Sequence, residues 1–222
     1  MSVYLTTWIL AFTLQNHHGS DWEHIYTDDG IEVFSQKPVD SDFFGFKGVG
    51  TIQASLATVF NVISDVEHEL DWVFLLESHR VLETPNAFER IEYQVFDLPW
   101  PADHRDFVFS VRAKTIDNKG SVLIEIQSVK VPNPPPSQGV RGELIKSLFL
   151  LEPIGPQLTK LTVEIFSDPK GMLPAWVVYF VQKQWPHATI MGIREQVLMP
   201  HAKEIPLPPR ALTPSGPVTI NP

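Results

Sequence analysis

Residues 98–109 read LPWPADHRDFVF, a proline-bounded segment that leads directly into an alternating strand pattern. Proline lacks the backbone N–H that the interior of a sheet requires, so residues 97–104 are expected to form a loop. Beyond this loop, Arg105, Phe107 and Phe109 fall on one face of the predicted strand. A buried guanidinium group needs a partner. Arg105 is therefore expected either to form a structural salt bridge at the end of the strand or to contact a ligand.

The composition indicates one acidic, folded domain. The chain has 222 residues, 43% of them hydrophobic, which is enough for a single domain with a substantial core. The formal net charge is −9 and no run of lysine or arginine occurs, which argues against nucleic-acid binding through phosphate neutralisation. The absence of cysteine excludes disulfides and thiolate metal ligands. No motif calls for a metal or a cofactor, and none is expected.

An apolar run, VYLTTWILAFTL, covers residues 3–14. It is shorter than the about 20 residues that span a bilayer. Its length suits the apolar part of an export signal, although no basic residue precedes it and no cleavage site is clear. We therefore expect residues 1–19 to be a hydrophobic leader of a periplasmic or secreted protein. The alternative is a first helix of a cytoplasmic protein.

Beyond this leader the sequence shows the pattern of an antiparallel α+β domain. Strands are predicted at residues 31–36, 43–52, 81–83, 88–96, 105–115, 121–131, 140–151 and 159–167. Short connections between them favour a curved antiparallel sheet. A helix is predicted at residues 55–64, with Ser55 as its N-cap. Gly45, Gly48 and Gly50 suggest that their strand is bent or bulged.

A long amphipathic helix is predicted at residues 174–197, with Val181, Trp185 and Met191 on its apolar side. At 1.5 Å per residue it is about 35 Å long, enough to cross the whole sheet. Pro186 is expected to kink it, because proline removes a backbone hydrogen bond.

Three other segments are interpreted as solvated or irregular. The carboxylates of residues 65–71 are expected to be solvated rather than catalytic. The proline-rich loop at residues 131–139 is expected to be a rigid connector. The tail at residues 199–222 lacks periodicity and is expected to be disordered.

Five short motifs resemble the START family, the steroidogenic-acute-regulatory-related lipid-transfer domains. They are DGIEV at residues 29–33, DVEHELDW at 65–72, PWPADHRDFV at 99–108, DPKGMLPAW at 168–176 and QKQWP at 182–186. Each is short, but their order and spacing are similar to those of the family over residues 20–198. The hydrophobic leader resembles that of exported bacterial members.

The resemblance implies a helix-grip (START/Bet v 1-like) fold, in which the curved sheet and the C-terminal helix enclose an apolar tunnel for one lipid. The loop at residues 97–104 and the helix at 174–197 would form its gate. Trp100 in that loop would either enter a membrane interface or pack onto the helix. The residues expected to line the tunnel are Ile91, Tyr93, Val95, Arg105, Phe107, Phe109, Ile124, Ile126, Val163, Val181, Trp185 and Met191.

Two positions differ from patterns within the family. Some members carry a second arginine six residues after the first, where this chain has Val111, and without a bulge Arg112 points outward. Cholesterol-type members pair that arginine with a glutamate at the position of Glu92. The alternation of Ile91, Tyr93 and Val95 places Glu92 on the other face, so no sterol ligand is inferred. No aromatic cage for choline is evident, and the ligand class stays open.

Three functional hypotheses follow. The first is a non-enzymatic monomer that binds one hydrophobic ligand, a lipid above all, and carries it with transient membrane contact. The alternative is an enzyme that resembles polyketide cyclases and aromatases, with Arg105 and Tyr93 as inward-facing groups. The third is protein docking through the proline-rich segments at residues 132–136 and 206–217.

Overall fold

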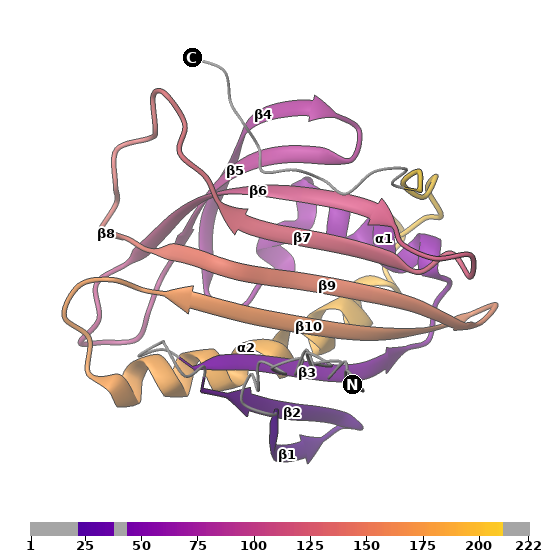
Figure 1. Ribbon diagram of the computed structural model, residues 1–222, viewed down its shortest axis with the longest axis horizontal. Helices are drawn as coiled ribbons and strands as arrows, with labels where there is room; N and C mark the ends of the chain where they lie inside the picture. The colour runs from indigo at the N-terminus through magenta and orange to yellow at the C-terminus, as the bar shows by residue number, and fades with distance from the viewer. Residues whose placement is uncertain (1–21, 38–43, 211–222) are drawn as a thin grey trace, which may run out of the picture.

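The computed structural model describes residues 22–37 and 44–210, and in this part of the chain ten strands form one sheet (Figure 1). The strands are β1 Glu23–Asp28, β2 Ile31–Gln36, β3 Gly45–Ile52, β4 Leu76–Asn86, β5 Glu89–Phe96, β6 Arg105–Thr115, β7 Val122–Ser128, β8 Val140–Arg141, β9 Glu143–Gly155 and β10 Leu158–Asp168. Nine of them follow the order β1-β2-β3-β10-β9-β7-β6-β5-β4, each antiparallel to its neighbours. The short strand β8 runs parallel to β6. The predicted antiparallel sheet is confirmed.

Two α-helices, α1 (Leu56–Ser64) and α2 (Ala175–Gln196), pack on one side of this sheet (Figure 1). The hydroxyl of Ser55 accepts a hydrogen bond of 3.2 Å from the backbone N–H of Thr58, so it caps α1 as predicted. The 3-10 helix η1 (Val66–Asp71) connects α1 to β4. Pro174 precedes α2 and Pro186 lies inside it. The predicted α+β helix-grip arrangement, a curved sheet with one long C-terminal helix, is confirmed.

The glycines of β3 allow α2 to lie directly against the sheet. A Cβ atom at Gly48 would lie 2.8 Å from Cβ of Pro186 and 3.1 Å from Cδ1 of Ile190. No such atom fits without a shift of α2. Pairing of β3 with β2 and β10 continues without a register shift, so the predicted bulge is wrong. The glycines serve close approach of a helix instead.

The main core lies between the helices and the facing side of the sheet. It joins Val59 and Phe60 of α1 and Ile190 of α2 to strand residues such as Leu161 and Val163. A second, smaller cluster lies on the other side of the sheet, where Ile91, Tyr93, Val95 and Val108 pack against Leu82, Val129 and Val131. Both faces of β5 are therefore covered.

Several boundaries differ from the prediction. β1 was not predicted, β4 is much longer than residues 81–83, and the turn between β9 and β10 lies at residues 156–157. The chain after α2 packs back on the domain as far as Arg210, where the tail was expected to be disordered. The Thr115 hydroxyl donates a hydrogen bond of 2.6 Å to the carbonyl oxygen of Pro208, and Ile205 packs against the core. The predicted leader, residues 1–19, lies outside the described residues.

Candidate functional site

A largely apolar cavity of about 150 Å³ lies between the sheet and α2. Its walls come from the end of α1, from η1 and the residues after it, from β5, β6, β7, β9 and β10, from the loops before β6 and before α2, and from α2. The lining residues are Ile63, Glu69, Trp72, Val73, Phe74, Leu75, Arg90, Glu92, Gln94, Phe96, Leu98, Arg105, Phe107, Phe109, Val111, Ile124, Ile126, Leu144, Ser147, Phe149, Ile165, Ser167, Pro169, Leu173, Val177, Val178, Val181, Gln182, Trp185 and Thr189.

Seven of the residues predicted to face the tunnel line this cavity: Arg105, Phe107, Phe109, Ile124, Ile126, Val181 and Trp185. Val163 and Met191 are not among the lining residues and belong to the core or pack against it. Trp100 is 91% exposed, so it does not pack onto α2. Leu98, from the same loop, lines the cavity instead.

The predicted orientation of β5 is wrong. Ile91, Tyr93 and Val95 were expected to face the tunnel, but they lie in the small cluster on the opposite side of the sheet. The residues that line the cavity from β5 are Arg90, Glu92, Gln94 and Phe96. Apolar alternation identifies the buried face of a strand only where the other face meets water. On β5 the chain at Val129 and Val131 covers the apolar face, so the polar face is free to form the cavity wall.

The polar residues of β5 form a connected group with Glu69 of η1. Arg90 makes an ion pair with Glu92, whose side chain is 1% exposed. The amide of Gln94 donates hydrogen bonds of 2.9 Å to Oε2 of Glu69 and 3.0 Å to Oε2 of Glu92. Nη2 of Arg90 also lies 3.5 Å from Oε1 of Glu69. We call Glu69, Arg90, Glu92 and Gln94 the polar cluster.

Burial raises the pKa of Glu69 to about 8, and the negative charge of Glu92 adds to that increase. The positive charge of Arg90 and the hydrogen bond from Gln94 act in the opposite direction. Burial therefore favours the protonated form of Glu69, which lies beside the ion pair of Arg90 and Glu92. The expectation that the acidic segment is solvated is wrong for Glu69, which is 3% exposed. Its neighbour Glu67 is exposed, as expected.

Three buried polar atoms on residues that line the cavity have no hydrogen-bond partner among the described residues. They are Nε1 of Trp72, Oγ of Ser147 and Oγ1 of Thr189. An unsatisfied buried polar atom costs about 1–3 kcal/mol. A ligand that carries hydrogen-bonding groups can remove that cost, so these atoms add polar binding capacity to the apolar walls.

Among residues 22–37 and 44–210, Arg105 finds no carboxylate for the salt bridge that was one of its two predicted roles. Its guanidinium donates hydrogen bonds to the carbonyl oxygens of Pro169 at 2.8 Å, Asp103 at 2.7 Å, His104 at 3.2 Å and Lys170 at 3.3 Å. Burial lowers the pKa of Arg105, and the charge of Asp103 opposes this. Arginine remains charged even so. Arg105 thus connects the loop at residues 97–104 with the loop that leads into α2, and it lines the cavity.

Arg90 and Arg112 show what surrounds the two positions, Val111 and Glu92, that were noted above as different from family patterns. Val111 lines the cavity, whereas Arg112 does not. Nε of Arg112 lies 3.7 Å from Oε1 of Glu89. Glu92 does not pair with Arg112, as expected, but the reason given was wrong: Glu92 lines the cavity, and it pairs with Arg90. Arg90 lies opposite Val111 on the neighbouring strand, so β5 supplies the guanidinium that β6 lacks at this point.

None of the helices in residues 22–37 and 44–210 is long and apolar enough to cross a membrane. The predicted apolar run at residues 3–14 is not covered by that finding.

Comparison with known proteins agrees with this architecture. The chain is 26% identical over 180 residues to an uncharacterized protein of Pseudomonas aeruginosa, covering 81% of this chain and 88% of that protein. It is 22% identical over 169 residues to the phosphatidylcholine transfer protein of Mus musculus, covering 74% of this chain and 78% of that protein. The structure of human StAR-related lipid transfer protein 5 superposes with a TM-score of 0.73 at 19% identity, covering 83% of this chain and 88% of the other. The START domain family model matches residues 12–186. The chain therefore belongs to the START domain family.

Proposed function

We propose that the protein is a monomeric lipid carrier that holds one lipid in the cavity and transfers it without chemical change. The observation that carries this proposal is an apolar cavity with a buried polar cluster in its wall. Burial of a ligand methylene contributes about 0.8 kcal/mol, so the apolar walls supply the affinity for acyl or ring carbons. The relative named phosphatidylcholine transfer protein supports the same class of ligand.

The polar head of the lipid is proposed to lie at the polar cluster. There Arg90 and the protonated Glu69 offer hydrogen-bond donors, while Glu92 keeps the local charge balanced. A neutral or zwitterionic head group fits this environment, because an additional net charge would be buried without a partner.

Entry of a lipid requires the cavity to open. Its volume of about 150 Å³ is below the roughly 300–1,000 Å³ of typical ligand sites. The proposed gate consists of the loop at residues 97–104 and the first half of α2. Arg105 joins that loop to Pro169 and Lys170, which lie in the segment leading into α2. Opening of the gate would break these hydrogen bonds.

Membrane contact is proposed at the gate. Trp100, Met172, Trp176 and Phe180 are exposed, and they lie on the loop at 97–104, on the loop before α2 and on the first turns of α2. Large apolar side chains gathered at one edge are typical of surfaces that contact a membrane or a partner. Indole rings in particular are favoured at the membrane interface. The gate would then open where the lipid is available.

Native mass spectrometry of the purified protein, titrated with phosphatidylcholine, cholesterol and a fatty acid, tests the proposal. One lipid per chain is expected. Val111→Trp should abolish the adduct, because the larger side chain occupies the cavity between Arg90 and Ile126. Tyr93→Phe is the control, since Tyr93 lies on the other face of the sheet. A folded Val111→Trp variant that still binds lipid in full would show that the cavity is not the lipid site.

The second candidate function is proton-transfer catalysis in the same cavity. One observation favours it: the carboxyl group of Glu69 is buried in the cavity wall beside Arg90 and Gln94, and this burial raises its pKa to about 8. Buried carboxyl groups with raised pKa values act as general acids in several enzymes. Mass spectrometry of the bound lipid before and after long incubation distinguishes the two functions. Recovery of unchanged lipid supports the carrier, and a product that Glu69→Gln fails to form supports catalysis.

A further inference from the structure

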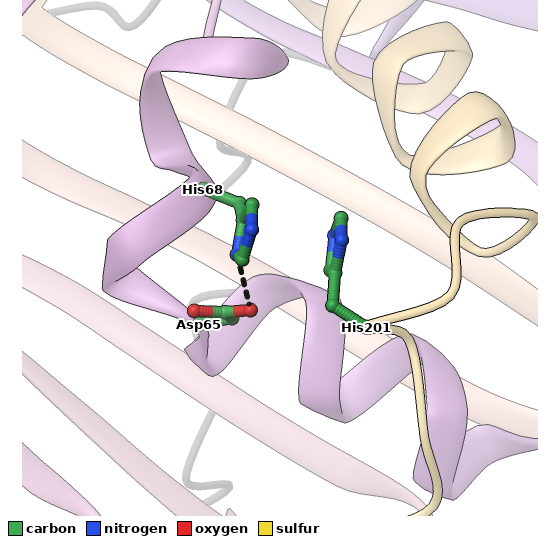
Figure 2. A group of neighbouring side chains, drawn as sticks. All are labelled: Asp65, His68 and His201. Atoms are coloured by element: carbon green, nitrogen blue, oxygen red, sulfur yellow. Dashed lines mark hydrogen bonds and ion pairs between the residues drawn. The ribbon is translucent and has the colours of Figure 1, made fainter.

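Two histidines and one aspartate meet outside the cavity, where α1 ends and the chain after α2 returns to the domain. Asp65 caps both α1 and η1, His68 lies on η1, and His201 follows α2. Figure 2 shows the two imidazole rings face to face, with the Asp65 carboxylate next to the ring of His68. One possible ligand atom from each residue lies within 4.8 Å of those of the other two.

Each of the two imidazole rings has one nitrogen in contact with a neighbouring side chain. Nδ1 of His68 lies 2.8 Å from Oδ2 of Asp65, and Nε2 of His201 lies 3.0 Å from Oε1 of Gln196. A neutral imidazole that donates from one nitrogen keeps a lone pair on the other. The ring centroids are only 3.6 Å apart and the planes differ by 5°.

We infer that Asp65, His68 and His201 form a binding site for a zinc ion. Two imidazole nitrogens and one carboxylate oxygen match the donor set of zinc sites that have three protein ligands and one water. Zinc bonds of about 2.0–2.2 Å hold tetrahedral ligand atoms about 3.4 Å apart. The possible ligand atoms of the three residues lie within 4.8 Å of one another, and the imidazole planes, which are now parallel, have to turn for both lone pairs to point at one ion. Rotation of partly exposed side chains is enough to direct the three donors at one ion.

The position of the site indicates what a bound ion would change. Its ligands join η1, which carries the cavity residue Glu69, to the chain five residues beyond the end of α2. Nearby, a Cβ atom at Gly192 of α2 would lie 2.8 Å from the carbonyl oxygen of Trp72, so these segments are already in close contact. Zinc would fix the C-terminal end of α2 and leave the first half of the helix, at the gate, free to move. This inference does not depend on the identity of the lipid.

Isothermal titration of the metal-free full chain with zinc chloride tests the site, and visible absorption of the cobalt(II)-substituted protein identifies its ligands. One zinc per chain is expected, together with a higher melting temperature in zinc than in chelator. His201→Ala and His68→Ala should each lower the zinc affinity by on the order of 100-fold and remove the absorption of tetrahedral cobalt. The melting temperature of each variant is measured with and without zinc, and the difference between these two values is compared with that of the wild type. A loss of stability that is unrelated to zinc lowers both values and does not affect the difference.

The controls address other groups that can bind metals. The double variant His17→Ala/His18→Ala removes two adjacent histidines outside the described residues, and Asp29→Asn alters the group formed by Asp28, Asp29 and His187. Both should retain the titration and the cobalt spectrum. Absence of zinc binding to the wild-type chain in millimolar zinc, or full affinity in His201→Ala, would overturn the inference.

Discussion

Nε of Arg105 donates a hydrogen bond of 2.8 Å to the carbonyl oxygen of Pro169, which lies in the loop that leads into α2. The same guanidinium group binds the carbonyl oxygens of Asp103 and His104, in the loop before β6. A single side chain therefore holds together two loops that line the cavity. Its charge is satisfied by backbone dipoles, which keeps it buried without a carboxylate partner.

Substitution of Arg105 tests this role. Arg105→Lys should lower the free energy of unfolding by on the order of 2 kcal/mol, because a lysine ammonium group cannot reproduce the branched contacts to both loops. It should also speed the exchange of bound lipid, measured by transfer of a fluorescent phosphatidylcholine between vesicles. Arg112→Lys, on the same strand but outside the cavity, is the matched control. Transfer by Arg105→Lys at the wild-type rate would contradict a role in the gate.

The pH dependence of stability should report on Glu69. Its pKa is raised to about 8 in the folded protein, so the native state holds a proton that the unfolded chain releases near pH 4.5. Stability contributed by that proton is present below about pH 4.5 and is lost as the pH rises toward about 8, by up to about 1.4 kcal/mol for each pH unit.

Glu69→Gln should reduce this loss, because an amide keeps the hydrogen bond from Gln94 and does not ionise. Urea unfolding at several pH values between 5 and about 8.5 measures the effect. Glu67→Gln, on the same 3-10 helix but exposed, should leave the profile unchanged. An identical profile for wild type and Glu69→Gln would show that Glu69 is ionised throughout this range.

Membrane contact at the gate can be separated from lipid binding. Trp100→Ala should weaken binding to phosphatidylcholine vesicles several-fold, since an exposed indole contributes strongly at the interface. The lipid adduct seen by native mass spectrometry should persist, because Trp100 does not line the cavity. Leu198→Ala is the control: Leu198 is also exposed but follows the far end of α2. Equal vesicle binding by both variants would place the contact elsewhere.

Gly48→Ala should destabilise the packing of α2 on β3. The added methyl group would lie 2.8 Å from Cβ of Pro186, which costs about 1–3 kcal/mol where the backbone cannot shift. Thermal unfolding measures this loss. Gly155→Ala, where the nearest atom would be 3.3 Å away at Leu158, should change the stability much less. A melting temperature for Gly48→Ala equal to that of Gly155→Ala would show that α2 moves without cost.

Local sequence was sufficient to predict most elements of the fold. The predicted range of β2 agrees with the structure, β6 begins at Arg105 as expected, and α2 differs from its predicted range by one residue at each end. These elements are defined by alternation, helical periodicity, an N-cap and prolines, which are all properties of neighbouring residues. β1 was missed because its exposed, mixed sequence at Glu23–Asp28 shows no alternation.

The same local signals could not give the composition of the cavity wall. The alternation on β5 was identified correctly, but which face looks into the cavity depends on the segment near Val129 and Val131 that covers the other side. Glu69 belongs to an acidic segment that is otherwise partly or fully exposed, and only the docking of η1 against Arg90 and Gln94 buries it. Each of these contacts joins residues far apart in the chain.

The sequence by itself determined the strands, the long helix, the family motifs and the inward face of β6, because each depends on the pattern of nearby side chains. Tertiary structure alone decided that Glu92 and Glu69 face the cavity, that Arg105 binds backbone carbonyls, and that His68 stacks on His201. The physical reason is that burial and pairing of a polar group depend on what lies across from it. That neighbour comes from another part of the chain, which only the folded arrangement brings close.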